Sequence, residues 1–167
     1  MIKRLLLILS LVFLVSFSLN AQDVKQPAVA LIPYPVTLVE GEGAFVFTEK
    51  TVVSLEDKEM EAIARDFIGL FTKAAGFTPK LKVNNKKGEV RLMKDDSLQE
   101  EGYTLEVTSE KILMRAASVK GAFYALQTLR QLLPSAIESN ECNPDVVWEV
   151  PAIRVIDEPR FGYRGLM

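Results

Sequence analysis

The sequence predicts an α+β domain in which a mainly antiparallel sheet carries two helices on one face. Three observations lead to this fold class. Residues 57–76 and 118–134 repeat apolar side chains at helical spacing. The segments around them are short and alternate apolar with polar residues, as half-buried strands do. Polar turns, rather than long crossovers, join the middle segments, which favours antiparallel pairing.

The N-terminus is predicted to be a signal peptide over residues 1–21. Lys3 and Arg4 precede an uncharged, mostly apolar stretch, and small and polar residues follow it up to Ala21. The apolar stretch is shorter than the roughly 20 residues that span a bilayer. A retained N-terminal anchor is the alternative. We therefore expect cleavage near Ala21, export to the periplasm or the cell exterior, and a folded domain over residues 22–155.

Two short strands are expected at the start of this domain. Gly41 and Gly43 indicate a turn. Residues 44–48 (AFVFT) and 51–55 (TVVSL) then have the composition of strands. The Gly-x-Gly pair precedes a strand rather than a helix, so it lacks the context of a nucleotide-binding loop.

The first helix follows, with Asp57 as a suitable N-cap and Gly76 as a suitable stop. Its charged side chains are expected to face water. The predicted apolar face consists of Met60, Ile63, Ala64, Phe67, Phe71, Ala74 and Ala75.

The middle of the chain predicts four strands. KLKV and EVRLM flank the polar turn NNKKG, and residues 103–107 and 112–116 alternate on either side of a Ser109-Glu110 turn. This second pair is the clearest predicted hairpin. VVWEV and AIRVID are expected to form two late strands.

The second helix lies between these groups of strands, with Ser118 as its cap and Pro134 as its stop. Its predicted apolar positions are Val119, Ala122, Phe123, Leu126, Leu129 and Leu133.

Composition excludes several kinds of site. The chain contains no His, which removes Ser-His-Asp and Cys-His catalysis and any His metal ligand. Cys142 is its single cysteine, so neither an internal disulfide nor a Cys-rich zinc site can form, and its polar loop predicts no role. The formal net charge is −2 and no Lys/Arg-rich block occurs, so nucleic acid is not an expected partner.

Three stretches in order resemble the β-N-acetylhexosaminidases of glycoside hydrolase family 20. IPYPVTLVEGEGAFVF resembles the start of that family's N-terminal non-catalytic domain, and EEGYTLEVTSEKILMRAASVKGAFYALQTLRQLLP resembles its hairpin and long helix. VPAIRVIDEPRFGYRGLM resembles the junction into the catalytic barrel. Other hexosaminidase or glucuronidase families share this type of domain, but PRFGYRGLM favours family 20.

The resemblance implies an activity and a second domain. The family removes terminal N-acetylglucosamine or N-acetylgalactosamine from glycans with retention, using the substrate's own acetamido oxygen as nucleophile. An Asp orients the acetamido group and the adjacent Glu protonates the leaving oxygen, without a metal or organic cofactor. Residues 156–167 are then the junction and first strand of a (β/α)₈ barrel of about 250 residues. We expect the rest of that barrel, which packs on residues 22–155, to be missing from this chain.

Arg164 is the candidate substrate-binding residue. By resemblance, the Arg in this strand hydrogen-bonds hydroxyls of the terminal sugar, and a guanidinium offers several fixed donors for such contacts. Tyr163 and Phe161 are expected to be packing residues.

Asp157-Glu158 matches the family's catalytic pair in composition only. In the family the pair follows a His-x-Gly-Gly stretch, whereas this chain has no His. Pro159 follows directly and fits a bend between domains. We therefore expect Asp157-Glu158 to be a solvated or junction-capping pair, and we expect no catalytic residue in this chain. Asp95-Asp96 and Glu100-Glu101 are expected to be ordinary loop carboxylates.

Two functional hypotheses remain open. The chain is either the inactive N-terminal part of a glycosidase or a free-standing secreted domain that binds a glycan or a partner without catalysis. YRGLM resembles an unfinished strand, which favours the first hypothesis. The reading frame beyond codon 167 would discriminate between them.

Overall fold

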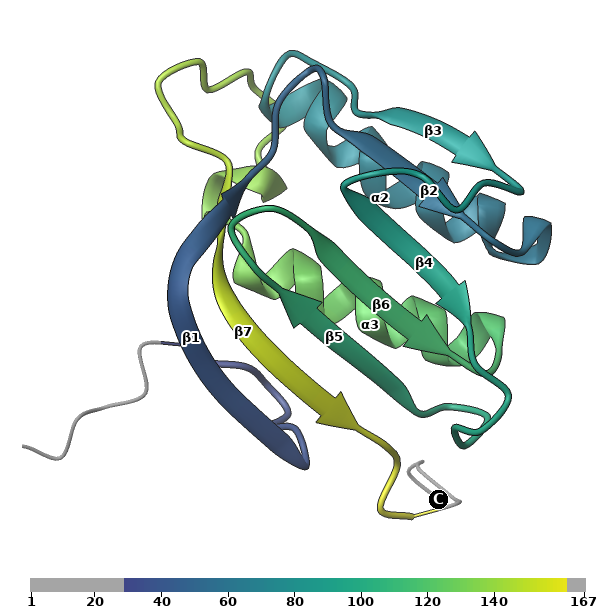
Figure 1. Cartoon of the computed structure of the whole chain (residues 1–167). Coiled ribbons are helices and arrows are strands. Elements are labelled where there is room, and N and C mark those ends of the chain that lie inside the picture. The colour runs from purple at the N-terminus through teal and green to yellow at the C-terminus, as the bar shows by residue number, and fades with distance from the viewer. Residues whose placement is uncertain (1–28, 162–167) are drawn as a thin grey trace, which may run out of the picture.

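The computed structural model describes residues 29–161, which form one seven-stranded sheet with two helices on the same face (Figure 1). This confirms the predicted α+β class. The strand order is β1-β7-β5-β6-β4-β2-β3. In chain order the elements are β1 (Thr37–Val46), β2 (Val52–Leu55), η2 (Lys58–Met60), α2 (Glu61–Ala74), β3 (Lys80–Val83), β4 (Val90–Lys94), β5 (Tyr103–Val107), β6 (Ile112–Ala116), α3 (Val119–Leu132), η3 (Ser135–Glu138) and β7 (Glu149–Asp157).

The sheet is mixed, where we expected mainly antiparallel pairing. β1, β7, β5 and β6 pair antiparallel, and the β5–β6 hairpin forms as predicted. β4 pairs parallel to β6, and β2 lies parallel between β4 and β3. Because α2 carries the chain back across the sheet, β3 enters in the same direction as β2, as in a βαβ unit. The segment NNKKG therefore closes no hairpin.

The expected turn at Gly41 and Gly43 is instead part of strand β1. The register with β7 shifts between Glu40 and Ala44, which is a β-bulge. Gly43 has a φ of +88°, a conformation that glycine adopts without steric cost, so the strand bends without ending. Instead of two late strands there is one, β7, which includes all of AIRVID but only Glu149 and Val150 of VVWEV. Pro151 of this strand pairs with Ala44 beside the bulge.

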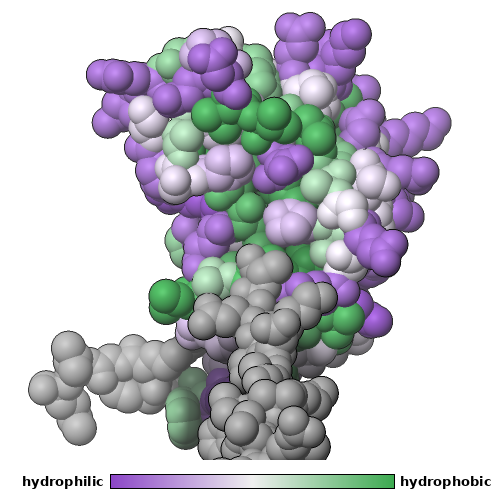
Figure 2. Space-filling view, turned by 90° about the vertical axis from the view of Figure 1, so that its left-hand side faces the viewer, coloured by the Kyte–Doolittle hydropathy of each residue, from purple (hydrophilic) through white to green (hydrophobic). Residues whose placement is uncertain are grey.

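β1 is an edge strand, and its outer side carries both charge and apolar surface. Seen from that side, apolar surface lies between hydrophilic flanks (Figure 2). Val39 and Val46 are exposed, but so are Glu40 and Glu42. Charged side chains and a bulge are common protections against edge-to-edge pairing of sheets.

Aromatic side chains join α2 to the sheet. Phe71 is completely buried, and its ring centroid lies 4.7 Å from that of Phe47 and 6.1 Å from that of Trp148. Phe67 completes the cluster at 5.8 Å from Phe71. The predicted apolar face of this helix is confirmed, with Ile68 buried in addition.

The predicted face of α3 needs one correction. Ala122, Leu126 and Leu129 are buried as expected, but Phe123 is 43% exposed. The helix presents Ala125 and Leu132 to the sheet instead. Phe123 therefore lies at the border of the buried face, where it lines a groove between the two helices.

Within residues 29–161, no helix has the length and apolar character needed to cross a membrane.

Candidate functional site at the carboxyl end of β7

The predicted site residue Arg164 lies outside the described residues, as does Tyr163. The chain can be followed to Phe161, whose side chain is 73% exposed and so is not packed into this domain. The part of the predicted site region that can be analysed is therefore the end of β7, with Asp157 and Glu158.

A small cavity lies at this end of β7. Its volume is about 150 Å³, below the ~300–1,000 Å³ typical of small-molecule sites. Strands β5 and β7, helix α3 and the N-terminal segment all contribute to its wall. The lining residues are Pro33, Glu101, Tyr103, Tyr124, Gln127, Thr128, Gln131, Asp157, Glu158 and Pro159.

Asp157 holds the N-terminal segment in place. Its Oδ1 accepts a hydrogen bond from the backbone N–H of Val36 at 3.1 Å. The two residues are far apart in sequence, but β1 and β7 are paired neighbours in the sheet. This contact fits the junction-capping role predicted for the pair.

Gln131 of α3 fixes the same segment from the other side. Its Oε1 accepts from the N–H of Ile32 at 3.0 Å, and its Nε2 donates to the carbonyl oxygen of Ile32 at 3.1 Å. The amide thus forms both hydrogen bonds that a strand neighbour would form. Nothing in the local sequence around Gln131 predicted this contact.

Tyr103 is one of the residues that line the cavity. Its side chain is buried, and its hydroxyl lies 2.6 Å from the hydroxyl of Thr128, which is also buried. Burial raises the pKa of Tyr103 to about 12; the hydrogen bond with Thr128 opposes this effect and the Asp157 carboxylate adds to it. The buried contact between the two hydroxyls joins β5 to α3, which is a structural role.

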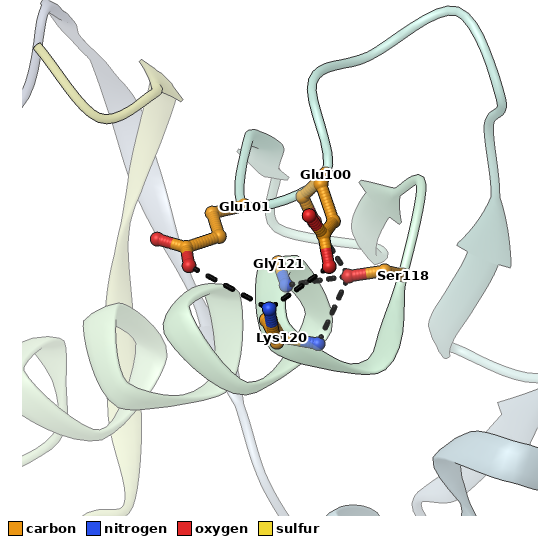
Figure 3. A network of polar contacts seen from close by, with 5 residues as sticks. All are labelled: Glu100, Glu101, Ser118, Lys120 and Gly121. Carbon is orange, nitrogen blue, oxygen red and sulfur yellow. Dashed lines mark hydrogen bonds and ion pairs between the residues drawn. The ribbon is translucent and has the colours of Figure 1, made fainter. Parts of the chain in front are cut away.

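Two carboxylates, those of Glu100 and Glu101, hold their loop against the N-terminus of α3 (Figure 3). The Oγ of Ser118 accepts from the N–H of Lys120 at 3.1 Å and of Gly121 at 3.4 Å, and donates to the carbonyl oxygen of Glu100 at 2.5 Å. The ammonium of Lys120 reaches Glu100 at 2.9 Å and Glu101 at 4.0 Å. The hydrogen bond that Lys120 donates to the Glu100 carboxylate raises the pKa of Lys120. Ser118 is confirmed as the helix cap, and the carboxylates tie a loop to the helix.

The other polar residues considered from sequence have local roles. Asp95 accepts hydrogen bonds from the backbone and hydroxyl of Ser97, which lowers its pKa and closes a turn. Cys142 is exposed and unpaired. Among residues 29–161, no cluster of three or more His, Cys, Asp or Glu side chains could hold a metal ion.

These features describe a domain whose polar groups mainly secure its own fold. Comparison with known proteins then decides its family. Residues 28–158 match the family model described as "Glycosyl hydrolase family 20, domain 2". The chain belongs to glycosyl hydrolase family 20. This confirms the family predicted from the sequence.

Curated family 20 relatives are much longer than this chain. A β-hexosaminidase of Porphyromonas gingivalis is 31% identical over 165 residues, which are 94% of this chain and 21% of the relative. A β-N-acetylhexosaminidase of Cellulomonas fimi is 31% identical over 146 residues, which are 84% of this chain and 28% of the relative. The chain thus spans less than a third of either relative.

Solved family 20 structures share the fold. A mutant β-hexosaminidase of Streptomyces plicatus, in complex with the product N-acetylglucosamine, has a TM-score of 0.75 and 27% identity, over 83% of this chain and 28% of that one. A chitobiase of Flavobacterium johnsoniae has a TM-score of 0.63 and 27% identity, over 81% of this chain and 22% of that one. The mixed sheet with two helices is therefore a family 20 architecture.

Proposed function

We propose that this chain is the N-terminal, non-catalytic part of an exported β-N-acetylhexosaminidase. The complete enzyme would remove terminal N-acetylhexosamine from glycans by substrate-assisted retaining hydrolysis. The observation that carries this proposal is the match of residues 28–158 to a single domain of family 20, in relatives named as hexosaminidases that extend far beyond it. The product N-acetylglucosamine bound to the Streptomyces plicatus enzyme supports the substrate class.

The chain by itself is proposed to be inactive. Hydrolysis requires a positioned general acid and a partner that orients the acetamido group. The Asp157 carboxylate instead accepts a hydrogen bond from the Val36 backbone, and the cavity beside it is smaller than ordinary ligand sites. Pro159 restricts the backbone directly after Glu158. This environment favours a structural role for the adjacent carboxylates.

Arg164 is proposed to bind sugar hydroxyls once residues 156–167 continue into a catalytic barrel. Active sites of such barrels lie at the carboxyl ends of their strands, where a guanidinium can donate to vicinal hydroxyls. An Arg164→Ala variant of the longer protein should lose activity, whereas Arg160→Ala, four residues earlier, is the matched control and should retain most of it.

The test measures hydrolysis of a chromogenic N-acetylglucosaminide by two proteins. One is the purified chain without residues 1–21, and the other is the protein encoded when the reading frame is followed past codon 167. We expect turnover from the longer protein only. Turnover by the short chain that disappears in an Asp157→Ala/Glu158→Ala double variant would contradict the proposal and assign catalysis to that pair.

A reading frame that closes after codon 167 would favour the second hypothesis. The chain would then be a free-standing secreted domain, and binding of N-acetylhexosamine-terminated glycans without turnover would be its expected activity.

A further inference from the structure

We propose that one half of the open sheet face binds a sulfated polysaccharide that contains N-acetylhexosamine. This surface lies over β3, β2, β4 and β6, and we call it the basic face. Its cationic side chains are Lys80, Lys82, Lys86, Lys87, Arg91 and Arg115. The choice of a glycan as the occupant rests on the proposed function, and the inference adds the charge class of that glycan.

The lysines come from a part of the chain that has no acidic residue. Residues 67–88 contain five lysines and neither Asp nor Glu, although the formal net charge of the whole chain is −2. Apolar residues and asparagines interrupt the lysines, as in KLKVNNKK. The composition of the whole chain therefore conceals a local excess of positive charge, and the fold decides whether these charges share a surface.

The two helices leave one face of the sheet open. Figure 1 shows the sheet from this open face, with α2 and α3 behind it. On the helical side, Val53 of β2 and Leu92 of β4 are buried in the core. Because side chains alternate along a strand, the residues next to them, Ser54 and Arg91, point to the open face.

Strand register extends this row of open-face side chains to the edge of the sheet. Lys82 of β3 and Arg91 of β4 are both paired with Ser54 of β2, which lies between them. Lys80 lies two residues before Lys82 and so on the same face, and Arg115 of β6 alternates with buried core neighbours on either side. Since neighbouring strands are about 4.8 Å apart, the row spans about 14 Å from β3 to β6.

A loop adds Lys86 and Lys87 to the same face. Residues 84–89 join β3 to β4, and β2 lies between these two strands in the sheet. A Cβ added at Gly88 would lie 3.0 Å from the hydroxyl oxygen of Ser54, so the loop passes over the open side of β2. Both lysines are exposed.

The cations of the basic face have few anionic partners within residues 29–161. None of its four lysines forms an ion pair there. Arg91 has one long contact, with its Nη2 3.4 Å from Glu56, and its buried Nε has no hydrogen-bond partner among the described residues. A guanidinium has five N–H donors, so the exposed ones remain for an anion. Unpaired like charges repel one another, and a bound polyanion would relieve that repulsion.

The carboxylates near these cations are fewer and are already engaged. Glu89 accepts a hydrogen bond from a backbone N–H of β2 at 2.9 Å, and Glu56 is the partner of Arg91. Asp95 lies near Arg115 and accepts hydrogen bonds from a serine of its own turn. The basic face therefore keeps an excess of positive charge.

The other half of the open face provides a contrast. Glu106 of β5 and Arg154 of β7 are both exposed and lie directly across from each other. Opposite charges in this position stabilise a sheet. Val39 of β1 continues the same row with an apolar side chain. The excess of positive charge is thus confined to the half that contains β3.

Protection of the sheet edge does not account for the whole basic face. Lysines on an edge strand prevent pairing with other sheets, which would explain Lys80 and Lys82. Arg91 and Arg115, however, lie on strands that have neighbours on both sides, and the other two lysines lie in a loop. A binding function accounts for all six cations.

The composition of the basic face favours a polysaccharide over a lipid surface or a nucleic acid. Among residues 29–161, the exposed large apolar side chains lie outside these four strands and the 84–89 loop, whereas a membrane-binding surface combines cations with apolar anchors. Residues 78–116 contain one aromatic residue, Tyr103, which is buried, so bases would find no stacking platform. Lysine and arginine can bind sulfate groups without either feature.

The arrangement of the cations favours sulfate over uronate carboxylates alone. The six side chains are spread along a row and a loop and do not converge on one point. On such a surface the affinity depends on the number of charges that the ligand carries along its length. Sulfation raises that number.

The test measures binding of chondroitin sulfate, whose N-acetylgalactosamine units carry sulfate, to this chain without residues 1–21. Isothermal titration calorimetry at about 50 mM and about 300 mM NaCl should show at least ~10-fold weaker binding at the higher concentration. A Lys82→Gln/Lys87→Gln variant should bind at least ~10-fold more weakly than the wild type at the lower concentration.

The matched control is Lys58→Gln/Lys73→Gln. It removes the same charge from exposed positions in η2 and α2, and it should bind as the wild type does. Circular dichroism at the temperature of the titration shows that both variants are folded.

Several outcomes would overturn the inference. Absence of binding, or equal binding by the two double variants, would show that the basic face is not a site for this glycan. Equal affinity for unsulfated chondroitin would show that sulfate is not recognised. Equal affinity for duplex DNA or for anionic phospholipid vesicles would show a general response to polyanions.

Hexosaminidase activity of the protein encoded past codon 167, measured in parallel, separates these failures from failure of the proposed function. An active longer protein combined with no binding by this chain would overturn the basic face alone. Sulfate-dependent binding by this chain combined with an inactive longer protein would overturn the proposed function and support the basic face.

Discussion

Phe67 belongs to the aromatic cluster that joins α2 to the sheet. It is 5% exposed and contacts the rings of Phe47 and Phe71. Phe67→Asp would bury an unpaired carboxylate and remove these contacts, so we expect a loss of about 3 kcal/mol or more in the free energy of unfolding. Thermal and urea denaturation followed by circular dichroism would measure this loss.

Phe123→Asp is the matched control for that substitution. Because Phe123 is 43% exposed, the same change should cost the isolated chain less than about 1 kcal/mol. The assigned buried faces of the helices would be contradicted if Phe67→Asp had the same Tm as the wild type. They would also be contradicted if the two substitutions lowered the free energy of unfolding equally.

Tyr103 predicts a dependence of stability on alkaline pH. Its pKa rises from 10.0 to about 12 on folding, so between these values the folded state retains a proton that the unfolded state has lost. The stability contributed by this group is complete below pH 10 and is lost as the pH rises toward 12. Tyr103→Phe should remove that part of the pH dependence.

The measurement is urea denaturation at steps between pH 9 and pH 12 for the wild type and Tyr103→Phe. A Tyr34→Phe variant, whose ring is 58% exposed, is the control and should follow the wild type. Identical slopes for the wild type and Tyr103→Phe would show that the hydroxyl does not ionise differently on folding.

At the scale of elements, two helical glycines should respond in opposite ways to alanine. Gly69 of α2 has no atom within 4 Å of the position of an added Cβ. Gly69→Ala should therefore stabilise the domain by about 0.5–1 kcal/mol, because alanine is the better helix former. An added Cβ at Gly121 of α3 would lie 2.4 Å from the carbonyl oxygen of Gly102. Gly121→Ala should be destabilising, by about 1–3 kcal/mol, because backbone atoms must move.

The pair is measured in the same denaturation experiment, with each glycine serving as the control for the other. Stabilisation by Gly121→Ala would mean that the loop before β5 is not held against α3 by the contacts in Figure 3.

At the scale of the whole molecule, export should remove the N-terminus. Lys3 and Arg4 followed by an apolar stretch predict cleavage near Ala21. The intact mass of the protein from its native host should correspond to a chain that begins at Gln22. A species that still begins at Met1 would indicate retention in the membrane instead, and cell fractionation would then locate it.

The sequence by itself determined the features that depend on near neighbours. Helical spacing identified the buried face of α2, alternation identified the β5–β6 hairpin, and a serine before an apolar repeat identified the cap of α3. The order of three family-like stretches identified family 20. In the candidate site, Pro159 after an acidic pair predicts a junction between domains, which stays a prediction; the structure adds that Asp157 accepts a hydrogen bond from the backbone of Val36.

Only the tertiary structure decided which segments meet. Strand patterns specify a buried face but not a partner, so the parallel pairing of β2 with β3 and β4 could not be predicted, nor could the bulge that keeps β1 in one piece. The contacts of Tyr103 with Thr128 and of Gln131 with Ile32 join residues distant in sequence. A hydrogen bond forms only when its donor and acceptor atoms lie within about 3 Å of each other. For residues far apart in sequence, that distance is set by the folded backbone and cannot be inferred from the neighbouring residues.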